Sequence, residues 1–260
     1  AEGHRTFVIS WRNPDASLSH ATWDDYVESG VIKAIEVAAS IAQMPQVNAL
    51  GFCVGGTLLT SALGVLAARE QDPVASATLL TTLVDFTDVG VLDVFIDEAF
   101  VQFREAQFSQ GGLMLGRDMA STFSFLRPND LVWNYVVGNY LKGETPPPFD
   151  LLYWNSDATH LPGPLYAWYL RQTYFENNLI KPGHTVICGE RIDLRKVDLP
   201  GSLQEWMSQA EEKPGSWWPD WYAWLKKHAG QQVAAPKQYG RGSYKMIEPA
   251  PGRYVKAKAH

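Results

Sequence analysis

Apolar residues along the chain fall into short continuous runs, typical of buried strands, and longer runs with helical spacing. The short runs predict strands at residues 6–11, 47–50 and 75–84. Residues 22–25 form a capping box that opens a helix, and residues 57–68 are apolar all round, which predicts a buried helix. This alternation of strands and helices predicts an α/β fold whose parallel sheet is covered on both faces.

Beyond about residue 88 the helical spacing dominates. Apolar stretches at 91–108, 131–141 and 151–179 predict helices. We expect residues from about 88 to 179 to form a mostly helical cap that is inserted after the third strand. The C-terminal part is expected to add a short strand at 182–188, a helix that begins at 202, a helix within 214–228, and an extended end over 239–260. We expect residues 1–260 to form a single domain with this cap as a subregion.

The composition suits a globular protein and argues against two kinds of partner. The chain has 260 residues, of which 46% are hydrophobic and 12% aromatic, so it can bury a sizeable core. Its net charge of −6 argues against nucleic acid, which favours a basic surface. No apolar stretch approaches the roughly 20 residues of a membrane span, and no signal-peptide pattern appears at the start.

The chain contains two cysteines, Cys53 and Cys188, which are far apart in sequence. We expect both to be reduced, as in most cytosolic chains with distant cysteines. No spacing of cysteine and histidine suggests a metal site.

Cys53 lies in the sequence LGFCVGG, between an apolar strand and an apolar helix. This is the pattern of a nucleophile elbow, in which serine is the usual nucleophile. Gly51, Gly55 and Gly56 would let the strand and the helix approach each other, and the turn would lift the Cys53 sulfur clear of the sheet. The first amides of the helix, notably that of Val54, would then be able to hold an oxyanion and would favour a thiolate.

A glycine-rich turn with a structural buried cysteine is the simpler alternative for the same residues. The flanking strand and helix favour the elbow, because they are the context that the motif requires. Sulfur in place of oxygen suggests acyl transfer from a thioester. An acyl-cysteine is itself a thioester, so the acyl group stays activated for a second acceptor, and a large aromatic cap would exclude water.

Several long motifs, in this order along the chain, resemble the polyhydroxyalkanoate synthases, most closely those of class I. They are SWRNPD at 10–15, TWDDY at 22–26, GFCVGGTLL at 51–59, LLTTLVDF at 79–86, FSFLRPNDLVWNYVV at 123–137, PFDLLYWNSDATHLPGP at 148–164, GSWWPDW at 215–221 and PAPGRYVKAK at 249–258.

The resemblance implies an α/β-hydrolase fold with a cap and a Cys-Asp-His triad. In it, Cys53 matches the nucleophile, and the backbone N–H of Val54 would supply an oxyanion contact. Asp85 matches an aspartate near the elbow that is not the triad member, and Trp154 matches a tryptophan near the substrate path.

The resemblance also implies the reaction and its partners. Cys53 would accept a 3-hydroxyacyl group from its CoA thioester, and a 3-hydroxyl group would then attack an acyl thioester to extend a polyester chain. Acyl-CoA is a substrate, and no cofactor is expected. A cytoplasmic homodimer at the surface of polyester granules, with granule-associated proteins as neighbours, is the arrangement that the resemblance implies.

The triad aspartate and histidine of this family are not found in the sequence. Their loops should lie between residues 197–200 and the helix that begins at 202, but Pro200 runs directly into Gly201. Several dozen expected residues, including two core strands, are absent there, and so are the strands expected before Ala1. Segments omitted from the sequence, an engineered form and a truly incomplete chain are all compatible with this pattern.

Asp193 or Asp198, followed by His228, would satisfy the acid-then-base order, but His228 and Asp198 have simpler explanations. His228 follows a helix whose dipole favours a cation, and Asp198 suits a solvated loop. His160 suits a cap or surface position, and His184 a loop.

The tryptophans at 217, 221 and 224 share one helical face and are expected to be core, although a binding role for polymer or a dimer partner remains open. Two functional alternatives to the synthase also remain. One is a cysteine thioesterase or hydrolase of the same fold. The other is a catalytically incomplete fragment with a role in dimerisation or granule binding.

Overall fold

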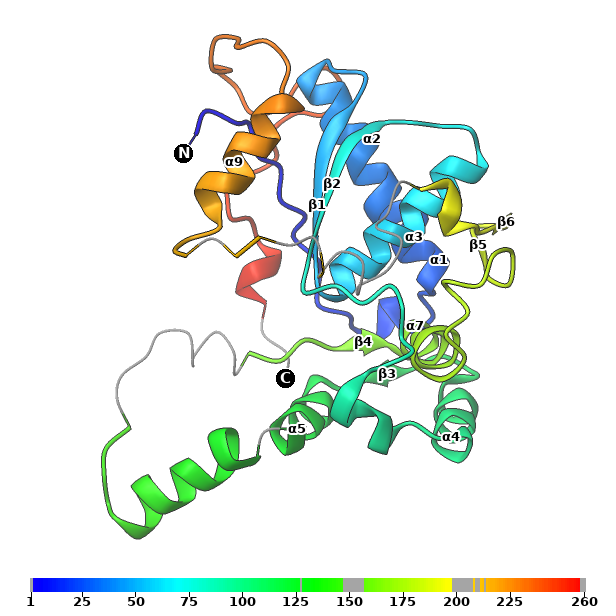
Figure 1. Ribbon diagram of the computed structural model, residues 1–260, viewed down its shortest axis with the longest axis vertical. Helices are drawn as coiled ribbons and strands as arrows, with labels where there is room; N and C mark the ends of the chain where they lie inside the picture. The colour runs from blue at the N-terminus through cyan, green and yellow to red at the C-terminus, as the bar shows by residue number, and fades with distance from the viewer. Residues whose placement is uncertain are drawn as a thin grey trace. The chain divides into compact units, whose positions relative to one another are not determined.

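The structure is a computed structural model that describes residues 2–126, 128–146, 157–197, 208, 211, 212 and 214–257. These residues form two compact units (Figure 1). Unit 1 consists of Ala1–Ile9, Asp24–Asp85 and Asn178–Pro249, and unit 2 consists of Ser10–Trp23, Phe86–Asn177 and Ala250–His260. The range Phe86–Asn177 in unit 2 is close to the range assigned to the cap from the sequence.

Unit 1 is built on two parallel strands, β1 (Val47–Phe52) and β2 (Val74–Leu80), as the apolar runs predict. The pairing places Leu50 opposite Thr78 and Phe52 opposite Leu80. The third predicted strand ends four residues early, because Thr81 adopts a left-handed φ of 46° that breaks the extended backbone.

One face of this sheet is covered by helices that the sequence predicts. The first is a continuous helical stretch of α1 (Trp23–Asp25), η2 (Tyr26–Ile32) and α2 (Lys33–Ala42), whose side chains Val27, Val31 and Ile35 are buried. The second is α3 (Val54–Ala68), which contacts β1 and is buried along most of its length. Figure 1 shows α2 and α3 on one side of β1 and β2, with α9 on the other.

Helix α9 (Trp218–Lys227) covers part of the second face of the sheet. The indole Nε1 of Trp221 donates to Thr78 Oγ1 at 3.0 Å, and the Asn48 amide donates to the carbonyl of His228 at 3.2 Å. The expectation that the tryptophan face is core is only partly correct, because Trp217 is 44% exposed and stacks on the equally exposed Trp218.

A short hairpin, β5 (Val186–Ile187) and β6 (Glu190–Arg191), packs near the C-terminal part of α3 in place of the longer strand predicted at 182–188. Arg69 joins the two elements. Its guanidinium contacts both carboxylate oxygens of Glu28 at 2.8 and 2.9 Å, Glu190 at 3.4 Å and the carbonyl of Cys188 at 3.3 Å.

Unit 2 is mostly helical, with one short antiparallel strand pair. Its elements are η1 (Ala16–Leu18), η3 (Gly90–Phe95), α4 (Glu98–Phe108), β3 (Leu113–Met114), α5 (Gly116–Leu126), η4 (Asn129–Trp133), η5 (Val136–Leu141), β4 (Leu161–Pro162), α7 (Gly163–Tyr169), η6 (Leu170–Phe175) and η8 (Tyr254–Lys256). Trp23 stacks on Trp168 and Tyr169, with ring centroids 4.8 and 5.1 Å away. Arg171 binds Glu105 through two hydrogen bonds.

Three sequence expectations are wrong. The helix expected over 151–179 begins, among the described residues, only at Gly163, because residues 157–160 are not helical and Leu161–Pro162 forms β4. Residues 6–11 form no strand and are exposed, with Val8 85% exposed, because none of the three two-stranded sheets of the described residues includes a pairing with this segment. The single helix expected over 91–108 is divided, because the Asp97 carboxylate accepts the Phe100 N–H and begins a new helix there. The helix expected from 202 lies almost entirely outside the described residues.

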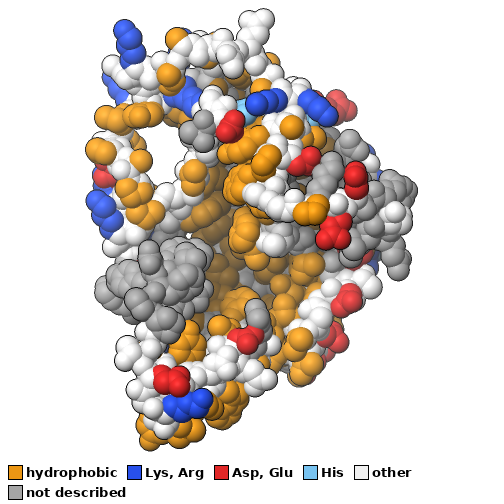
Figure 2. Space-filling view, turned by 60° about the vertical axis from the view of Figure 1, so that its left-hand side comes forward, with side chains coloured by type: hydrophobic (Ala, Val, Ile, Leu, Met, Phe, Trp, Pro, Cys, Tyr) orange, Lys and Arg blue, Asp and Glu red, His pale blue; other side chains and the backbone are white. Residues whose placement is uncertain are grey.

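Many apolar side chains of the described residues are exposed at the surface (Figure 2).

We expect Arg69→Met to lower the free energy of unfolding at pH 7 by about 1–2 kcal/mol, because it removes charge-assisted hydrogen bonds at a partly exposed site. The hydrogen bonds from Arg69 hold the pKa of Glu28 below its ordinary value. This contribution is therefore complete above the unfolded-state pKa of about 4.3, and it is lost as the pH falls through the lower folded-state pKa.

Urea denaturation of both proteins between pH 7 and pH 3 measures the effect. Arg195→Met is the control, since Arg195 is 73% exposed and bonds only its near neighbour Asp193 in the described contacts. A difference in stability that persists undiminished at pH 3, or an equal loss in the control, would contradict the prediction.

Candidate active site

Cys53 occupies a sharp turn between the last residue of β1 and the first residue of α3. Its backbone has φ 52° and ψ −128°, a combination that residues other than glycine rarely adopt and that costs about 1–3 kcal/mol. Its side chain is exposed. The strand, turn and helix thus have the arrangement that the nucleophile-elbow motif requires.

Close packing explains two of the glycines in the motif. A Cβ added to Gly51 would lie 2.5 Å from the Cα of Gly56, so only glycine lets the strand and the helix approach this closely. A Cβ added to Gly55 would meet nothing within 4 Å, so Gly55 is not required for packing.

The first turn of α3 presents backbone N–H groups beside the cysteine. The N–H of Gly56 donates to the Cys53 carbonyl at 2.8 Å, while those of Val54 and Gly55 precede it in the helix. Amides at this position lack intrahelical acceptors and are suited to binding an anion. The oxyanion role of Val54 remains a prediction.

The loop that follows β2 lies at the same end of the sheet as Cys53, because the strands are parallel and Phe52 is opposite Leu80. This loop is tied to α3 by the Thr57 hydroxyl, which is buried and donates to the Leu83 carbonyl at 2.9 Å. The same loop continues to Asp85, which is exposed, five residues after the end of β2. Its role near the elbow remains a prediction. Trp154, predicted on the substrate path, lies outside the described residues.

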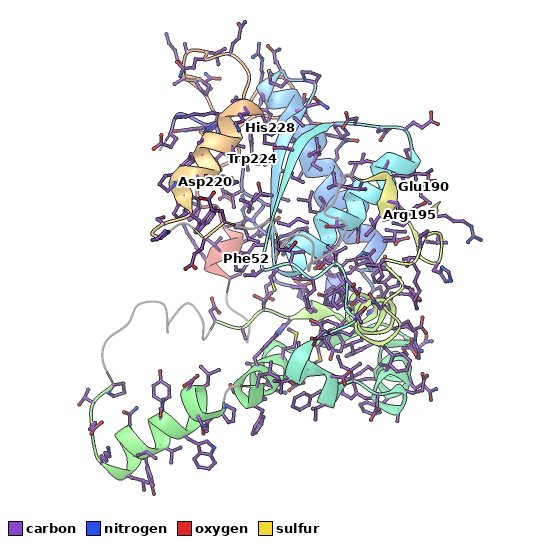
Figure 3. The ribbon with its side chains drawn as sticks, in the orientation of Figure 1. Phe52, Glu190, Arg195, Asp220, Trp224 and His228 are labelled. Atoms are coloured by element: carbon purple, nitrogen blue, oxygen red, sulfur yellow. The ribbon has the colours of Figure 1, made fainter. Side chains whose placement is uncertain are left out.

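His228 is held far from Cys53. Its carbonyl accepts from Asn48 near the start of β1, and its ring lies 4.6 Å from that of Trp224. Five residues of strand separate Asn48 from Cys53, which corresponds to about 16 Å. Figure 3 shows His228 and Phe52 toward different ends of the sheet, so His228 is not positioned as a base for Cys53.

Asp193 is also placed away from the elbow. It caps η7 (Leu194–Lys196), and its carboxylate binds the Arg195 guanidinium at 2.7 and 2.9 Å, which lowers its pKa to about 2. The adjacent Ile192 and Leu194 pack on Gly64, about 16 Å along α3 from Cys53. The acid and base considered from the sequence are therefore not brought together with the cysteine, and Asp198 lies outside the described residues.

The remaining candidate histidines have local roles. His160 Nδ1 accepts the Gly116 N–H at 3.0 Å, and the backbone N–H of His160 donates to Asn13 Oδ1 at 2.9 Å, both within unit 2. His184 is exposed in the loop before β5, with its Nδ1 3.4 Å from the Pro182 carbonyl.

The two cysteines have different environments, and neither forms a disulfide. The Cys188 sulfur lies 3.5 Å from the Asp24 carbonyl, and burial, together with Asp24 and Glu28, raises its pKa to about 12. Cys188 is therefore protonated at neutral pH, whereas Cys53 is open to solvent at the end of the sheet. Within the described part of the chain, no cluster of potential metal ligands and no helix able to span a bilayer is found.

A model of the α/β-hydrolase fold family matches residues 1–202. The chain belongs to this family. The α/β-hydrolase chain is also 49% identical, over 322 aligned positions, to the poly(3-hydroxyalkanoate) polymerase subunit PhaC of Cupriavidus necator, covering 99% of the chain and 55% of that protein. The corresponding subunit of Rhizobium meliloti and the poly(3-hydroxyalkanoate) polymerase of Methylorubrum extorquens are each 36% identical, with 99% and 100% of the chain and 51% and 52% of those proteins covered. These relatives confirm the resemblance to polyhydroxyalkanoate synthases.

The α/β-hydrolase chain spans about half the length of the curated relatives that it matches. The 322 positions aligned with the Cupriavidus necator protein also exceed the 260 residues of the chain, so at least 62 of them have no residue here. This agrees in size with the several dozen residues that the sequence motifs indicate are absent.

We expect Gly51→Ala to lower the free energy of unfolding by about 1–3 kcal/mol, because the new methyl group would collide with backbone atoms of α3. Gly55→Ala is the matched control. It has free space in a helix and is expected to be neutral or more stable by about 0.5–1 kcal/mol. Thermal and urea unfolding of the two variants tests this, and equal stability of both would contradict the packing described for the elbow.

Proposed function

We propose that this chain is the catalytic part of a polyhydroxyalkanoate synthase, which transfers short (R)-3-hydroxyacyl groups from CoA thioesters to a growing polyester through Cys53. One observation carries the proposal. An exposed cysteine occupies the strained turn between β1 and α3 in a chain that is 49% identical to a poly(3-hydroxyalkanoate) polymerase subunit.

The chemistry of sulfur supports transfer over hydrolysis. The Cys53 thiolate attacks the thioester carbonyl, a new carbon–sulfur bond forms, the bond to the CoA sulfur breaks, and CoA leaves with the proton that Cys53 released. Since one thioester replaces another, the acyl group keeps its reactivity. The 3-hydroxyl group of a second acyl unit then attacks it, loses its proton to a base, and regenerates the cysteine.

The surroundings of Cys53 are consistent with these steps. The amide of Val54 would stabilise the oxyanion of each tetrahedral intermediate from the start of α3. Asp85 would act near the elbow without being the triad acid, and Trp154 would line the substrate path, as in the resembling family. Acyl-CoA serves as substrate and no cofactor takes part. The working form is a cytoplasmic homodimer on polyester granules.

A second candidate is a catalytically incomplete form of the same protein. It is favoured by the positions of Asp193 and His228 away from Cys53 and by the 62 or more aligned positions at which a relative has residues and this chain has none. In this form the acid and base needed for turnover are lacking, and the chain acts in dimerisation or on granules.

The test is release of CoA from (R)-3-hydroxybutyryl-CoA, with the product analysed for polymer. We expect CoA release with polymer formation, a loss of at least about a thousandfold in Cys53→Ala, and little change in Cys188→Ala. The latter is a suitable control because the Cys188 thiol is half-buried and protonated.

The products distinguish the alternatives. Free hydroxy acid without polymer would identify a hydrolase, and unchanged turnover in Cys53→Ala would contradict the role of the cysteine. No release by the unmodified chain, together with release by the relative from Cupriavidus necator in the same assay, would favour the incomplete form.

A further inference from the structure

The side chain of Thr82 fills a space directly against the elbow. A Cβ added to Gly56 would lie 1.9 Å from Thr82 Oγ1, 2.6 Å from its Cγ2 and 2.8 Å from its Cβ. Thr82 therefore leaves no space for a side chain at position 56, so this residue must be glycine. Gly56 also lies against Gly51. The threonine comes from the loop after β2, so it joins that loop to the first turn of α3.

The Thr82 hydroxyl also lies next to two carbonyl groups that control the backbone of Cys53. Its oxygen is 3.1 Å from the Leu80 carbonyl, to which it donates, and 3.5 Å from the Cys53 carbonyl. The Leu80 carbonyl in turn accepts the Cys53 N–H at 2.9 Å. One hydroxyl thus contacts the groups on both sides of the strained residue.

The conformation of Cys53 needs such contacts in order to persist. A strained backbone is retained only where its surroundings fix it from several directions. The Cys53 carbonyl also accepts from the amides of Gly56 at 2.8 Å and Thr57 at 3.2 Å. The Thr57 hydroxyl fastens the same loop at Leu83, so the loop is held to α3 at two points.

We propose that Thr82 is a positioning residue for Cys53. Its side chain fills the space beside Gly56, with the hydroxyl oxygen nearest. That hydroxyl donates to the Leu80 carbonyl and lies within reach of the Cys53 carbonyl, so that the cysteine sulfur stays raised beside the first amides of α3. This role rests on the proposed function of Cys53 as the nucleophile. It assigns Thr82 no contact with substrate.

Alkylation by iodoacetamide at pH 8, followed by peptide mapping, measures the exposure and reactivity of Cys53 without any acyl-CoA. Cys188 does not interfere, because its pKa of about 12 leaves almost no thiolate at that pH. We expect Thr82→Val, which has nearly the same shape but no hydroxyl, to slow alkylation of Cys53 by about fivefold, because the sulfur loses its alignment with the helix N-terminus. We expect kcat for CoA release to fall by a similar factor with KM unchanged.

Thr82→Ser is expected to restore both rates to within about twofold of the unmodified protein, since it keeps the hydroxyl. Thr122→Val is the matched control. It removes a hydroxyl that, among the described contacts, bonds only a carbonyl of its own helix in unit 2, and it should change neither rate. Thr82→Ala replaces the valine variant if that variant does not fold.

Unchanged alkylation in Thr82→Val, or equal losses in the serine and valine variants, would overturn the proposal. The alkylation result is independent of the proposed function. If the unmodified protein released no CoA, the synthase assignment would fail, while the alkylation rates would still decide whether Thr82 positions the cysteine.

Discussion

The left-handed backbone of Cys53 is the constraint on which the site depends. It reverses the chain between strand β1 and the buried helix α3, and it leaves the sulfur exposed. The close approach of Gly51 to Gly56 permits the turn, and hydrogen bonds to both the N–H and the carbonyl of Cys53 hold it. The parallel pairing of β1 with β2 then places the Thr82 loop beside the turn. The position of the sulfur is therefore a consequence of backbone packing.

Several charged groups of unit 1 make contacts that stabilise the fold away from Cys53. Arg69 binds Glu28 and Glu190 beside the β5–β6 hairpin, and Asp193 is committed to Arg195. His228 caps α9 at the far end of β1. Because Asp193 and His228 are held at these places, they do not form a triad with Cys53, although they follow it in the acid-then-base order. The aligned positions at which the polymerase relatives have residues and this chain has none are therefore where a triad acid and base would be sought.

Local patterns were sufficient to predict much of the fold. Continuous apolar runs located β1, β2 and α3, and the glycines of LGFCVGG indicated the elbow. Features that depend on distant residues were not predictable. Residues 6–11 have strand-like composition but no neighbouring strand, and the fit of Thr82 against Gly56 joins positions 26 residues apart. The helix start at Asp97 was not predicted, because the apolar spacing alone was followed there, although aspartate is a favoured N-cap residue.

Mass spectrometry of the acylated protein shows most directly whether Cys53 carries the acyl group as a thioester. The chain would be mixed briefly with (R)-3-hydroxybutyryl-CoA, quenched in acid, digested and mapped. We expect hydroxybutyryl groups on the peptide that contains Cys53, removable by neutral hydroxylamine as a thioester is, and none on the peptide that contains Cys188. An adduct on another residue, or polymer formation without any adduct on Cys53, would contradict it.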